Sequence, residues 1–441
     1  MTYFTMAEKN KLKEAISTFK NKVVLVLGDV MLDQYSLGEV SRISPEAPIP
    51  IFKNMGVNSV PGGAANVALN LASLGASVIL SGVVGNDDRK EKLINILKKA
   101  KIDVGGVIID NSRPTTLKHR FIANNHQLLR FDDETVEHLH SAKENKIISF
   151  VNKNIAKVDI VILSDYAKGV FSKKLTQAVI KIAKRNKKKI IADIKPRNKD
   201  YFSGVDILVP NLKEAREITG LNNVLHIGPA LKKHFRSDIV LKRGSDGITV
   251  WKKNENKPKH LRARKVKVFD VSGAGDTVIA TLALGLASGL DLKSSAILGN
   301  HAGGIVVQKP GTATISIDEL EGVLRTGNHI EKVEIVAKVW GYEKWLENNP
   351  KYCCKILSLN KGYQCSLHYH KEKDEMFLVT KGQVKLELAK EVTYLRKGNF
   401  IRIPPGTVHR FYGVEDSEIL EVSTHHKEED SYRLEESKRV S

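Results

Sequence analysis

The chain is poor in cysteine and in long apolar runs. Its 441 residues include only Cys353, Cys354 and Cys365, too few for a disulfide framework, and no C-x-x-C spacing marks them as zinc ligands. We interpret them as reduced thiols on strands, with metal ligation as the alternative. No apolar run reaches transmembrane length, and no signal-peptide pattern opens the sequence. These absences predict a soluble, cytoplasmic protein that does not associate with membranes.

Acidic residues are outnumbered by basic ones. The sequence has 70 Lys and Arg against 50 Asp and Glu, a formal net charge of +20, yet residues 331–441 hold 19 basic and 18 acidic side chains. Nearly all of the excess therefore lies upstream of residue 331. A basic domain suits phosphorylated small-molecule substrates and nucleotides. We expect no nucleic-acid partner, because no basic patch is interleaved with aromatic residues.

A chain of 441 residues is long enough for two or three domains. From about residue 22 to 325, short apolar runs that read as buried strands alternate with helical patterns. The runs are Val23–Gly28, Ser77–Val84, Asp159–Ser164, Lys189–Asp193, Ile207–Pro210 and Asp238–Lys242. This alternation predicts an α/β domain over residues 21–325, with helices on both faces of a mostly parallel sheet and ligands at the carboxyl ends of the strands. Residues 1–20 read as a short helical extension.

Two segments interrupt this alternation. Residues 35–53 and 115–131 have the alternating pattern of strands, and we expect them to form antiparallel strands set aside from the main sheet as a small lid. Such strands can pair between subunits, so we expect a homodimer.

After about residue 330 the pattern changes to short strands separated by Gly or Pro, with no helix between them. This predicts an all-β barrel or sandwich over residues 331–425. The boundary between the two domains is expected within residues 326–331. Residues 426–441 are rich in charge, and we expect them to form a mobile tail.

The run from Asp270 to Thr277, Asp-Val-Ser-Gly-Ala-Gly-Asp-Thr, joins a Gly-rich turn to a helical pattern. The start of a helix has unpaired N–H groups and a partial positive charge, so it can hold an anion. Gly273 and Gly275 allow a phosphate to approach the backbone closely, and Asp276 can accept the proton of an attacking hydroxyl. The run therefore predicts phosphoryl transfer to an alcohol. Asp276 is also suited to capping the helix.

A second Gly-rich turn, residues 61–69, also precedes a helical pattern; tight helix packing would explain it if it stood alone. Together with the first turn, it resembles the two signatures of the ribokinase-like (PfkB) sugar kinases. Asn211-Leu-Lys-Glu214 is similar to the NxxE motif of that family, and residues 242–247 are similar to its nucleotide-side turn. The resemblance covers about residues 20 to 325 and implies a ribokinase-like fold that uses ATP and Mg²⁺.

The resemblance implies a role for each matching residue. Asp276 would be the catalytic base, and the backbone of Gly273, Ala274 and Gly275 would form the anion hole for the γ-phosphate. The residues expected to act on the Mg²⁺–phosphate network are Asn211 and Glu214, although Glu214 by itself also reads as a solvated acid at a helix start. The residues expected to bind ATP are Lys242, Gly244, Gly247, Asn300 and Gly303. Those expected to bind sugar hydroxyls are Asp33, Gly62, Gly63 and Asn66.

Longer runs indicate the sugar. Residues 28–35, 42–50, 127–132 and 163–169 are similar to the heptose 7-phosphate kinase half of the bifunctional ADP-heptose synthesis enzymes. The similarity implies phosphorylation of the anomeric hydroxyl of D-glycero-D-manno-heptose 7-phosphate to the 1,7-bisphosphate, in the synthesis of nucleotide-heptose precursors of surface polysaccharide. The alternatives are a kinase for another small sugar or nucleoside, and a sugar-sensing protein with a degenerate kinase site.

Lys195, Arg197 and Arg120 are candidates for contact with the phosphate of such a substrate, and plain surface charge is the alternative for each. The sequence departs from the family in two places. The usual Asp-Pro-Lys-Gly segment reads Asp-Ile-Lys-Pro at residues 193–196, and no HxGH nucleotidyltransferase motif follows residue 325.

Residues 362–382 are similar to the first cupin motif, and residues 398–409 are similar to the second, with Gly413 where its final Asn is usual. His368 and His370 are two apart, so on a strand their side chains share one face. The resemblance adds Glu375 and His409 as ligands. Three imidazoles and a carboxylate suit a divalent transition metal, Zn, Mn, Fe, Co or Ni; a metal-free cupin is the alternative.

Residues 340–343 and 404–410 are similar to the cupin domain of type II mannose-6-phosphate isomerases. The similarity implies aldose–ketose isomerisation of a sugar phosphate, in which a bound metal polarises a carbonyl. A non-catalytic domain that binds a sugar phosphate is the competing hypothesis.

Overall fold

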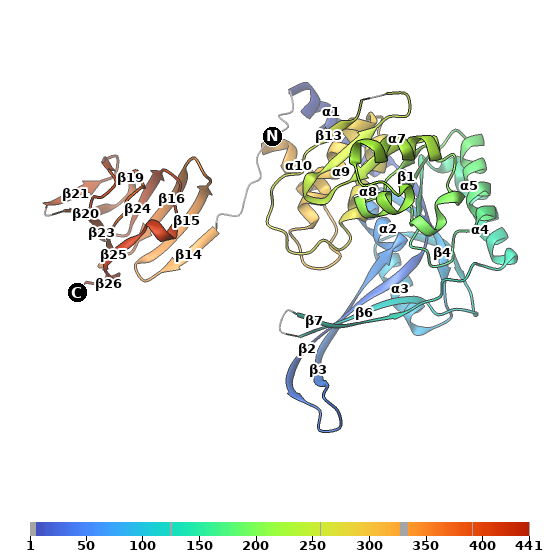
Figure 1. Ribbon diagram of the computed structural model, residues 1–441, viewed down its shortest axis with the longest axis horizontal. Helices are drawn as coiled ribbons and strands as arrows, with labels where there is room; N and C mark the ends of the chain where they lie inside the picture. Colours follow the sequence, from blue (N-terminus) through green and yellow to red (C-terminus); the bar gives the residue numbers. More distant parts are fainter. Residues whose placement is uncertain (1–5, 124–125, 256, 327–333, 390, 441) are drawn as a thin grey trace. The chain divides into compact units, whose positions relative to one another are not determined.

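The computed structural model describes residues 6–123, 126–255, 257–326, 334–389 and 391–440 (Figure 1). Contacts divide the chain into two compact units, Met1–His329 and Ile330–Ser441. The boundary predicted within residues 326–331 lies, apart from Thr326, outside the described residues.

No helix among those described is both long and apolar enough to span a membrane. All three cysteines are free thiols.

A nine-stranded sheet forms the centre of the first unit, as far as that unit is described, in the order β13-β12-β11-β10-β9-β8-β1-β4-β5. The strands are β1 (Val23–Gly28), β4 (Ser77–Val84), β5 (Asp103–Ile109), β8 (Ile160–Ser164), β9 (Lys189–Asp193), β10 (Ile207–Leu208), β11 (Asp238–Lys242), β12 (Ile248–Trp251) and β13 (Lys259–Leu261). The strands from β11 to β5 are parallel, and β12 and β13 add antiparallel pairs at one edge. The mostly parallel sheet predicted from the apolar runs is confirmed.

Helices cover both faces of this sheet. They are α1 (Met6–Ser17), α2 (Ala64–Ser73), α3 (Asp88–Lys99), α4 (Ser141–Asn154), α5 (Lys173–Arg185), α6 (Leu212–Thr219), α7 (Val224–Phe235), α8 (Ala274–Ala287), α9 (Leu292–Val306) and α10 (Ile317–Thr326). Alternate residues of β1 enter different cores: Val24 and Val26 pack with α2, α8 and α9, whereas Leu25 and Leu27 pack with α4, α5 and α7. Burial on both faces explains why β1 is a continuous apolar run.

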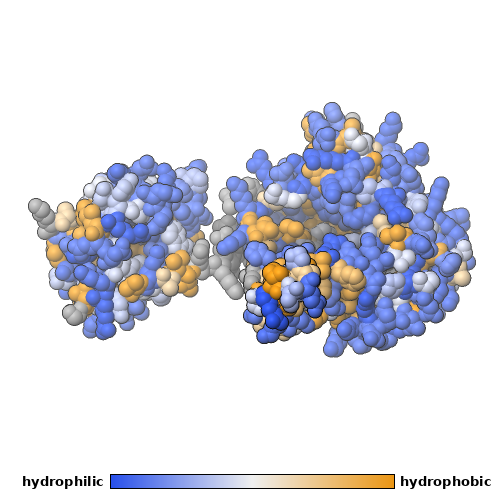
Figure 2. Space-filling view, turned by 60° about the horizontal axis from the view of Figure 1, so that its bottom comes forward, coloured by the Kyte–Doolittle hydropathy of each residue, from blue (hydrophilic) through white to orange (hydrophobic). Residues whose placement is uncertain are grey.

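A separate four-stranded sheet extends from this body and forms the lid (Figure 1). Its strands are β2 (Val30–Ile43), β3 (Pro50–Gly63), β6 (Thr116–Ala123) and β7 (His126–Asp133). The expectation of antiparallel strands holds for β2–β3 and β6–β7, but it is wrong for β2–β6, which are parallel. The reason is that the chain passes through the main sheet between β3 and β6, so β6 enters the lid from the same side as β2. Figure 2, in which the lid comes forward, shows apolar residues on it; Met55 is 66% exposed.

The second unit is built from antiparallel strands in two sheets. They are β14 (Glu334–Lys338), β15 (Gly341–Asn348), β16 (Cys353–Leu359), β17 (Tyr363–Gln364), β18 (Leu367–Tyr369), β19 (Glu375–Lys381), β20 (Gln383–Leu388), β21 (Glu391–Arg396), β22 (Phe400–Ile403), β23 (His409–Gly413), β24 (Ser417–Ser423), β25 (Tyr432–Glu435) and β26 (Lys438–Arg439). Phe377, Phe411 and Ile419 belong to the core between the sheets. The predicted all-β domain is confirmed.

The charged segment after residue 425 is part of this unit, so the prediction of a separate tail was wrong. Strand β25 pairs with β18, and β26 pairs with β17. The carboxylate of Asp430 is buried and accepts hydrogen bonds from the backbone N–H groups of Lys371, Glu372 and Lys373. Charge made the segment look like a solvated tail, but pairing between strands uses backbone groups that composition does not reveal.

Candidate functional site

The first turns of helices α2 and α8 meet in the first unit. Asn66, in α2, donates a hydrogen bond from Nδ2 to Oδ2 of Asp276, in α8, over 2.7 Å. Gly273 precedes α8 with φ of +75°, and a Cβ atom there would lie 2.8 Å from Nδ2 of Asn66. Both the positive φ and this close approach require glycine. The predicted anion hole and the predicted base thus lie at one helix start.

Asp276 is buried and is held by two donors. The hydroxyl of Tyr166 lies 2.5 Å from Oδ1, and Asn66 occupies Oδ2. Burial raises the pKa of Asp276 to about 6, against the hydrogen bonds from Tyr166 and Asn66, which lower it. A carboxylate with this pKa is mostly ionised near neutral pH and is still basic enough to accept a proton from a hydroxyl. Asn66, expected to bind sugar, contacts the predicted base, Asp276, in this structure.

Tyr166 was not among the predicted site residues. Its loop is anchored by the buried carboxylate of Asp29, which accepts hydrogen bonds from the backbone N–H groups of Tyr166 at 2.7 Å, Lys168 at 3.2 Å and Val170 at 3.1 Å. Residues 163–169 carried the resemblance to heptose kinases, and that was the only signal in the sequence. The contact of the Tyr166 hydroxyl with Asp276 could not be predicted, because the sequence does not show that this loop reaches α8.

A lysine lies beside the helix start. Nζ of Lys242 is 2.5 Å from Oδ2 of Asp193, and a Cβ atom on Gly275 would lie 3.3 Å from the same Nζ. Burial raises the pKa of Asp193, although the charge of Lys242 opposes the shift. The ammonium of Lys242 is therefore placed to neutralise a phosphate held by the N–H groups of α8.

Asn211 and Glu214 form a capping box at the start of α6. Oδ1 of Asn211 accepts a hydrogen bond from the N–H of Glu214, and Oε2 of Glu214 accepts one from the N–H of Asn211. Glu214 is 6% exposed and pairs with Lys195, so it is not a solvated acid. Burial raises its pKa, but the charges of Lys242 and Lys195 outweigh this effect and leave the pKa below its usual value.

The candidate sugar residues lie where the lid joins the body. Asp33, on β2, is buried, and its Oδ1 lies 2.8 Å from Nη1 of Arg120, on β6. A Cβ atom on Gly62 would lie 2.3 Å from Oδ2 of Asp33, so no side chain fits there. The ammonium of Lys118 lies 5.3 Å from the ring centre of Tyr166. Arg197, a candidate for phosphate contact, is exposed.

The other candidate ATP residues are Gly244, Gly247, Asn300 and Gly303. Nδ2 of Asn300 donates to the backbone oxygen of Arg262 over 2.9 Å. A Cβ atom on Gly247, which has φ of +89°, would lie 2.1 Å from the backbone oxygen of Leu261. Gly303 packs against Val278, whereas Gly244 faces open space. Gly247 and Gly303 therefore have packing reasons to be glycine, independent of a nucleotide.

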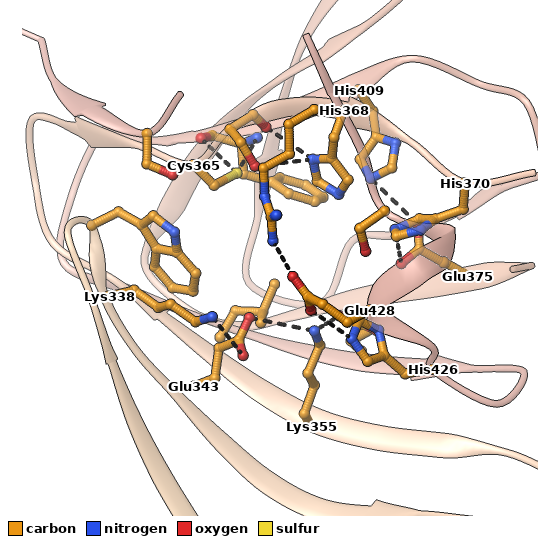
Figure 3. A pocket seen from close by; sticks show the side chains of 18 of the residues that line it. Lys338, Glu343, Lys355, Cys365, His368, His370, Glu375, His409, His426 and Glu428 are labelled. Atoms are coloured by element: carbon orange, nitrogen blue, oxygen red, sulfur yellow. Dashed lines mark hydrogen bonds and ion pairs between the residues drawn. The ribbon is translucent and has the colours of Figure 1, made fainter. Parts of the chain in front are cut away.

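In the second unit, three histidines line one end of a pocket of about 390 Å³ (Figure 3). Nδ1 of His368, His370 and His409 lies 2.9, 2.8 and 3.0 Å from the backbone oxygens of Ser366, Asp430 and Thr407, respectively. A carbonyl oxygen only accepts hydrogen bonds, so each Nδ1 carries a proton, and in the neutral tautomer with that proton Nε2 keeps a lone pair. Burial lowers the pKa of His368, to about 3, and that of His370. These neutral imidazoles are chemically fit to bind a metal through Nε2.

Glu375 lies among these histidines. Its Oε1 is 3.5 Å from Nε2 of His370, and its Oε2 is 3.4 Å from Nε2 of His409. Nζ of the buried Lys373 is 2.7 Å from Oε1 of Glu375. Within the described ranges, no group of three or more His, Cys, Asp or Glu side chains is already arranged to hold a metal ion. The structure thus brings the four predicted ligands together, and Lys373, which was not predicted, lies beside the carboxylate of Glu375.

Comparison with known proteins agrees with both halves of the chain. Residues 21–319 match the family model described as pfkB family carbohydrate kinase, and residues 355–423 match the model described as cupin domain.

Two relatives are bifunctional proteins named HldE. The one from Aliarcobacter butzleri is 39% identical over 335 residues, which cover 73% of this chain and 69% of that protein. The one from Gluconobacter oxydans is 38% identical over 311 residues, which cover 69% of this chain and 65% of that protein. The chain therefore spans about two thirds of the length of these relatives.

Solved structures support the fold. A ribokinase from Arabidopsis thaliana, complexed with ribose and ATP, matches with a TM-score of 0.56 and 20% identity over 69% of this chain and 99% of that one. Phosphofructokinase-2 from Escherichia coli, in complex with potassium, matches with a TM-score of 0.59 and 20% identity over 69% of this chain and 98% of that one. The expected ribokinase-like fold is confirmed.

Proposed function

The chain belongs to the pfkB family of carbohydrate kinases, and we propose that it transfers the γ-phosphoryl group of ATP to the anomeric hydroxyl of a heptose 7-phosphate. The observation that carries the proposal is the buried carboxylate of Asp276 at the glycine-rich start of α8. Asp276 removes the proton of the hydroxyl while the hydroxyl oxygen bonds to the γ-phosphorus. The bond between that phosphorus and the β,γ-bridging oxygen breaks. The products are ADP, which keeps the bridging oxygen, and the heptose 1,7-bisphosphate.

Charge neutralisation comes from several groups of this chain. We assign the N–H groups at the start of α8 to the transferring phosphate, and Lys242, whose Nζ would lie 3.3 Å from a Cβ atom on Gly275, would supply a positive charge beside them. Mg²⁺, bound with ATP, would supply further neutralisation, and we assign Asn211 and Glu214 to its water shell. Lys195 pairs with Glu214, so we assign it to this network instead of to the sugar phosphate.

For the phosphate of the substrate, the better candidates are Lys118 and Arg120. They are two apart on β6, so their side chains share one face. Lys118 lies over Tyr166, which contacts the base, and Arg120 contacts Asp33. The runs that resemble heptose 7-phosphate kinases, together with the similarity to the HldE proteins, support heptose 7-phosphate as the acceptor. A hexose, a pentose or a nucleoside is the alternative substrate. Because the chain spans only about two thirds of those relatives, their remaining activities are not assigned to it.

The test is ATP consumption by Asp276→Asn and by wild type with heptose 7-phosphate, fructose 6-phosphate, ribose and adenosine. We expect the heptose phosphate to be the preferred substrate and the variant to lose roughly 10²–10⁴-fold in kcat, the usual contribution of a general base, with little change in KM. Asp318→Asn, at an exposed position of α10, is the matched control. Wild-type turnover by Asp276→Asn would exclude this base, and preference for another acceptor would exclude the heptose.

We also propose that the cupin holds a divalent transition metal at His368, His370, Glu375 and His409. The three Nε2 lone pairs described above support it, and such a metal would act as a Lewis acid for a sugar carbonyl or hydroxyl. Metal analysis of the intact protein after incubation with Mn²⁺, Zn²⁺, Fe²⁺, Co²⁺ or Ni²⁺ should give one equivalent. The variant His368→Ala should lose it, and an unchanged stoichiometry in that variant would refute the assignment.

The exposed apolar residues of the lid support a homodimer in which two lids pair. They include Leu37, Ile43, Met55, Val57, Leu129 and Phe131. Light scattering should give twice the mass of the chain, and Met55→Arg should shift the protein toward the monomer. A monomeric wild type would contradict this assembly.

A further inference from the structure

The cupin pocket has a second end, away from His368 and His409, where His426 lies 5.1 Å from Trp345 between ring centres (Figure 3). Figure 3 shows Lys338, Glu343 and Lys355 on the opposite wall from His368 and His409. Trp345 belongs to this end through its contacts with Glu343 and Lys355, and Trp340 also lines the pocket. A volume of about 390 Å³ is within the range of pockets that enclose a small ligand. Neither the matching family model nor the kinase chemistry accounts for this wall.

Its charged groups form a continuous chain of pairs. Oε2 of Glu343 accepts a hydrogen bond from Nε1 of Trp345 over 3.1 Å and lies 3.6 Å from Nζ of Lys338. Oε1 of Glu343 is 3.4 Å from Nζ of Lys355, which is in turn 3.3 Å from Oε2 of Glu421. Donors and acceptors thus alternate at spacings of three to four ångströms along the wall. The ammonium of Lys355 also lies 4.8 Å from the ring centre of Trp345.

Because its lysines are already paired with carboxylates, this wall is poorly suited to bind an anion by charge alone. The charged side chains that line the pocket are Lys338, Lys355, Lys373, Arg433, Glu343, Glu375, Glu421, Glu428 and Glu436. Among the residues that the structure describes, four of these side chains are basic and five are acidic, so this lining is nearly neutral. Each of the three lysines lies within 3.6 Å of a carboxylate oxygen. A free phosphate would have to break such a pair, which is costly for the buried Lys355 and Lys373.

Neighbouring hydroxyl groups match the same wall well. A hydroxyl can donate to a carboxylate and accept from an ammonium, and adjacent hydroxyls of a sugar ring present this combination repeatedly. The C–H face of such a ring can pack on an indole. We propose that this end of the pocket binds a sugar ring, with its hydroxyls at Glu343 and Lys338 and its apolar face on Trp345. The ring hydroxyls, and not a phosphate, are what the wall recognises.

The inference rests on the proposed kinase function only for the choice of probe. The probes are D-glycero-D-manno-heptose, its 7-phosphate and inorganic phosphate, each titrated into the full chain carrying Asp276→Asn. The readout is tryptophan emission: of the three tryptophans, Trp340 and Trp345 line this pocket and Trp251 is buried in the first unit. Because no turnover is measured, failure of the kinase assignment leaves this experiment intact.

We expect both sugars to change the emission saturably and inorganic phosphate to leave it unchanged. Lys338→Met, at a half-exposed side chain, should raise the dissociation constant at least tenfold, and Glu343→Gln should do the same. Glu347→Gln, on the exposed end of β15, is the matched control, and Trp345→Phe should remove most of the signal. Saturation by inorganic phosphate, absence of a response to either sugar, or unchanged affinity in Lys338→Met would each overturn the proposal.

Discussion

Replacement of Tyr166 by phenylalanine tests how the base is tuned. In the free protein, the phenol donates a hydrogen bond to Oδ1 of Asp276 over 2.5 Å. This bond stabilises the ionised carboxylate, so it lowers the pKa of Asp276, which burial has raised to about 6. Tyr166→Phe removes the hydroxyl and keeps the ring. Its first consequence should be a further rise in that pKa.

The size of the rise follows from the strength of the lost interaction. A hydrogen bond to a charged group contributes about 1.5–3 kcal/mol, and one pKa unit corresponds to about 1.4 kcal/mol, so the pKa of Asp276 should rise by about one to two units. A base acts only when it is ionised. Near pH 7 the ionised fraction should therefore fall about two- to tenfold, and the loss should be recovered at about pH 9.

The assay is the pH dependence of kcat/KM for the sugar, which reports the pKa values of the free enzyme. The acid limb should move to higher pH in Tyr166→Phe and stay in place in Tyr394→Phe, an exposed tyrosine of the second unit. A merely structural role would lower kcat/KM equally at every pH. An acid limb that is unchanged, or that moves to lower pH, would refute the reasoning.

Two further predictions concern the anion hole and the second unit. Gly273→Ala should lower the kcat of the folded protein, because its Cβ would push Asn66 away from Asp276. The control is Gly289→Ala, where φ is a similar +85° and a Cβ would meet nothing within 4 Å, so its kcat should be unchanged. Equal kcat in the two variants, measured by steady-state kinetics, would contradict this prediction. Glu421 is buried between Lys355 and Lys373. Burial raises its pKa, but the two lysines outweigh this and lower it from 4.5 to about 2. Its contribution to stability is therefore present above pH 4.5 and lost as the pH falls toward 2. Glu421→Gln should cost about 1.5–3 kcal/mol at pH 7, because each of the two buried lysines loses one of its two carboxylate partners and keeps the other, Glu343 or Glu375. Chemical denaturation followed by Trp340 and Trp345 emission measures this loss, and a value under about 1 kcal/mol would contradict it.

The strands of the main sheet were predictable because their physical cause is local. A strand such as β1 is buried on both faces, so its sequence is uniformly apolar. Strands β5, β12 and β13, at the two edges, and the parallel pairing of β2 with β6 were not predicted. Pairing direction depends on where the chain enters a sheet, and no short run of residues encodes that path.

The cupin half shows the same division. The spacing of His368 and His370 predicted that they share a face, and the structure brings them together with Glu375 and His409. The role of Asp430 was missed, because a carboxylate in a charged segment reads as solvated. Lys373 was missed for a related reason. Its buried pairs with Glu375 and Glu421 join residues from different strands.

The sequence by itself determined the family and the order of the two domains, and it predicted Asp276 as the base, since glycines at a helix start and residues two apart on a strand are local patterns with local physical causes. Only the tertiary structure decided which groups surround that base and what lines the second pocket. Tyr166 reaches Asp276 from 110 residues away in the chain. Contacts of that range set burial, and burial sets the pKa values and ion pairs on which the chemistry depends.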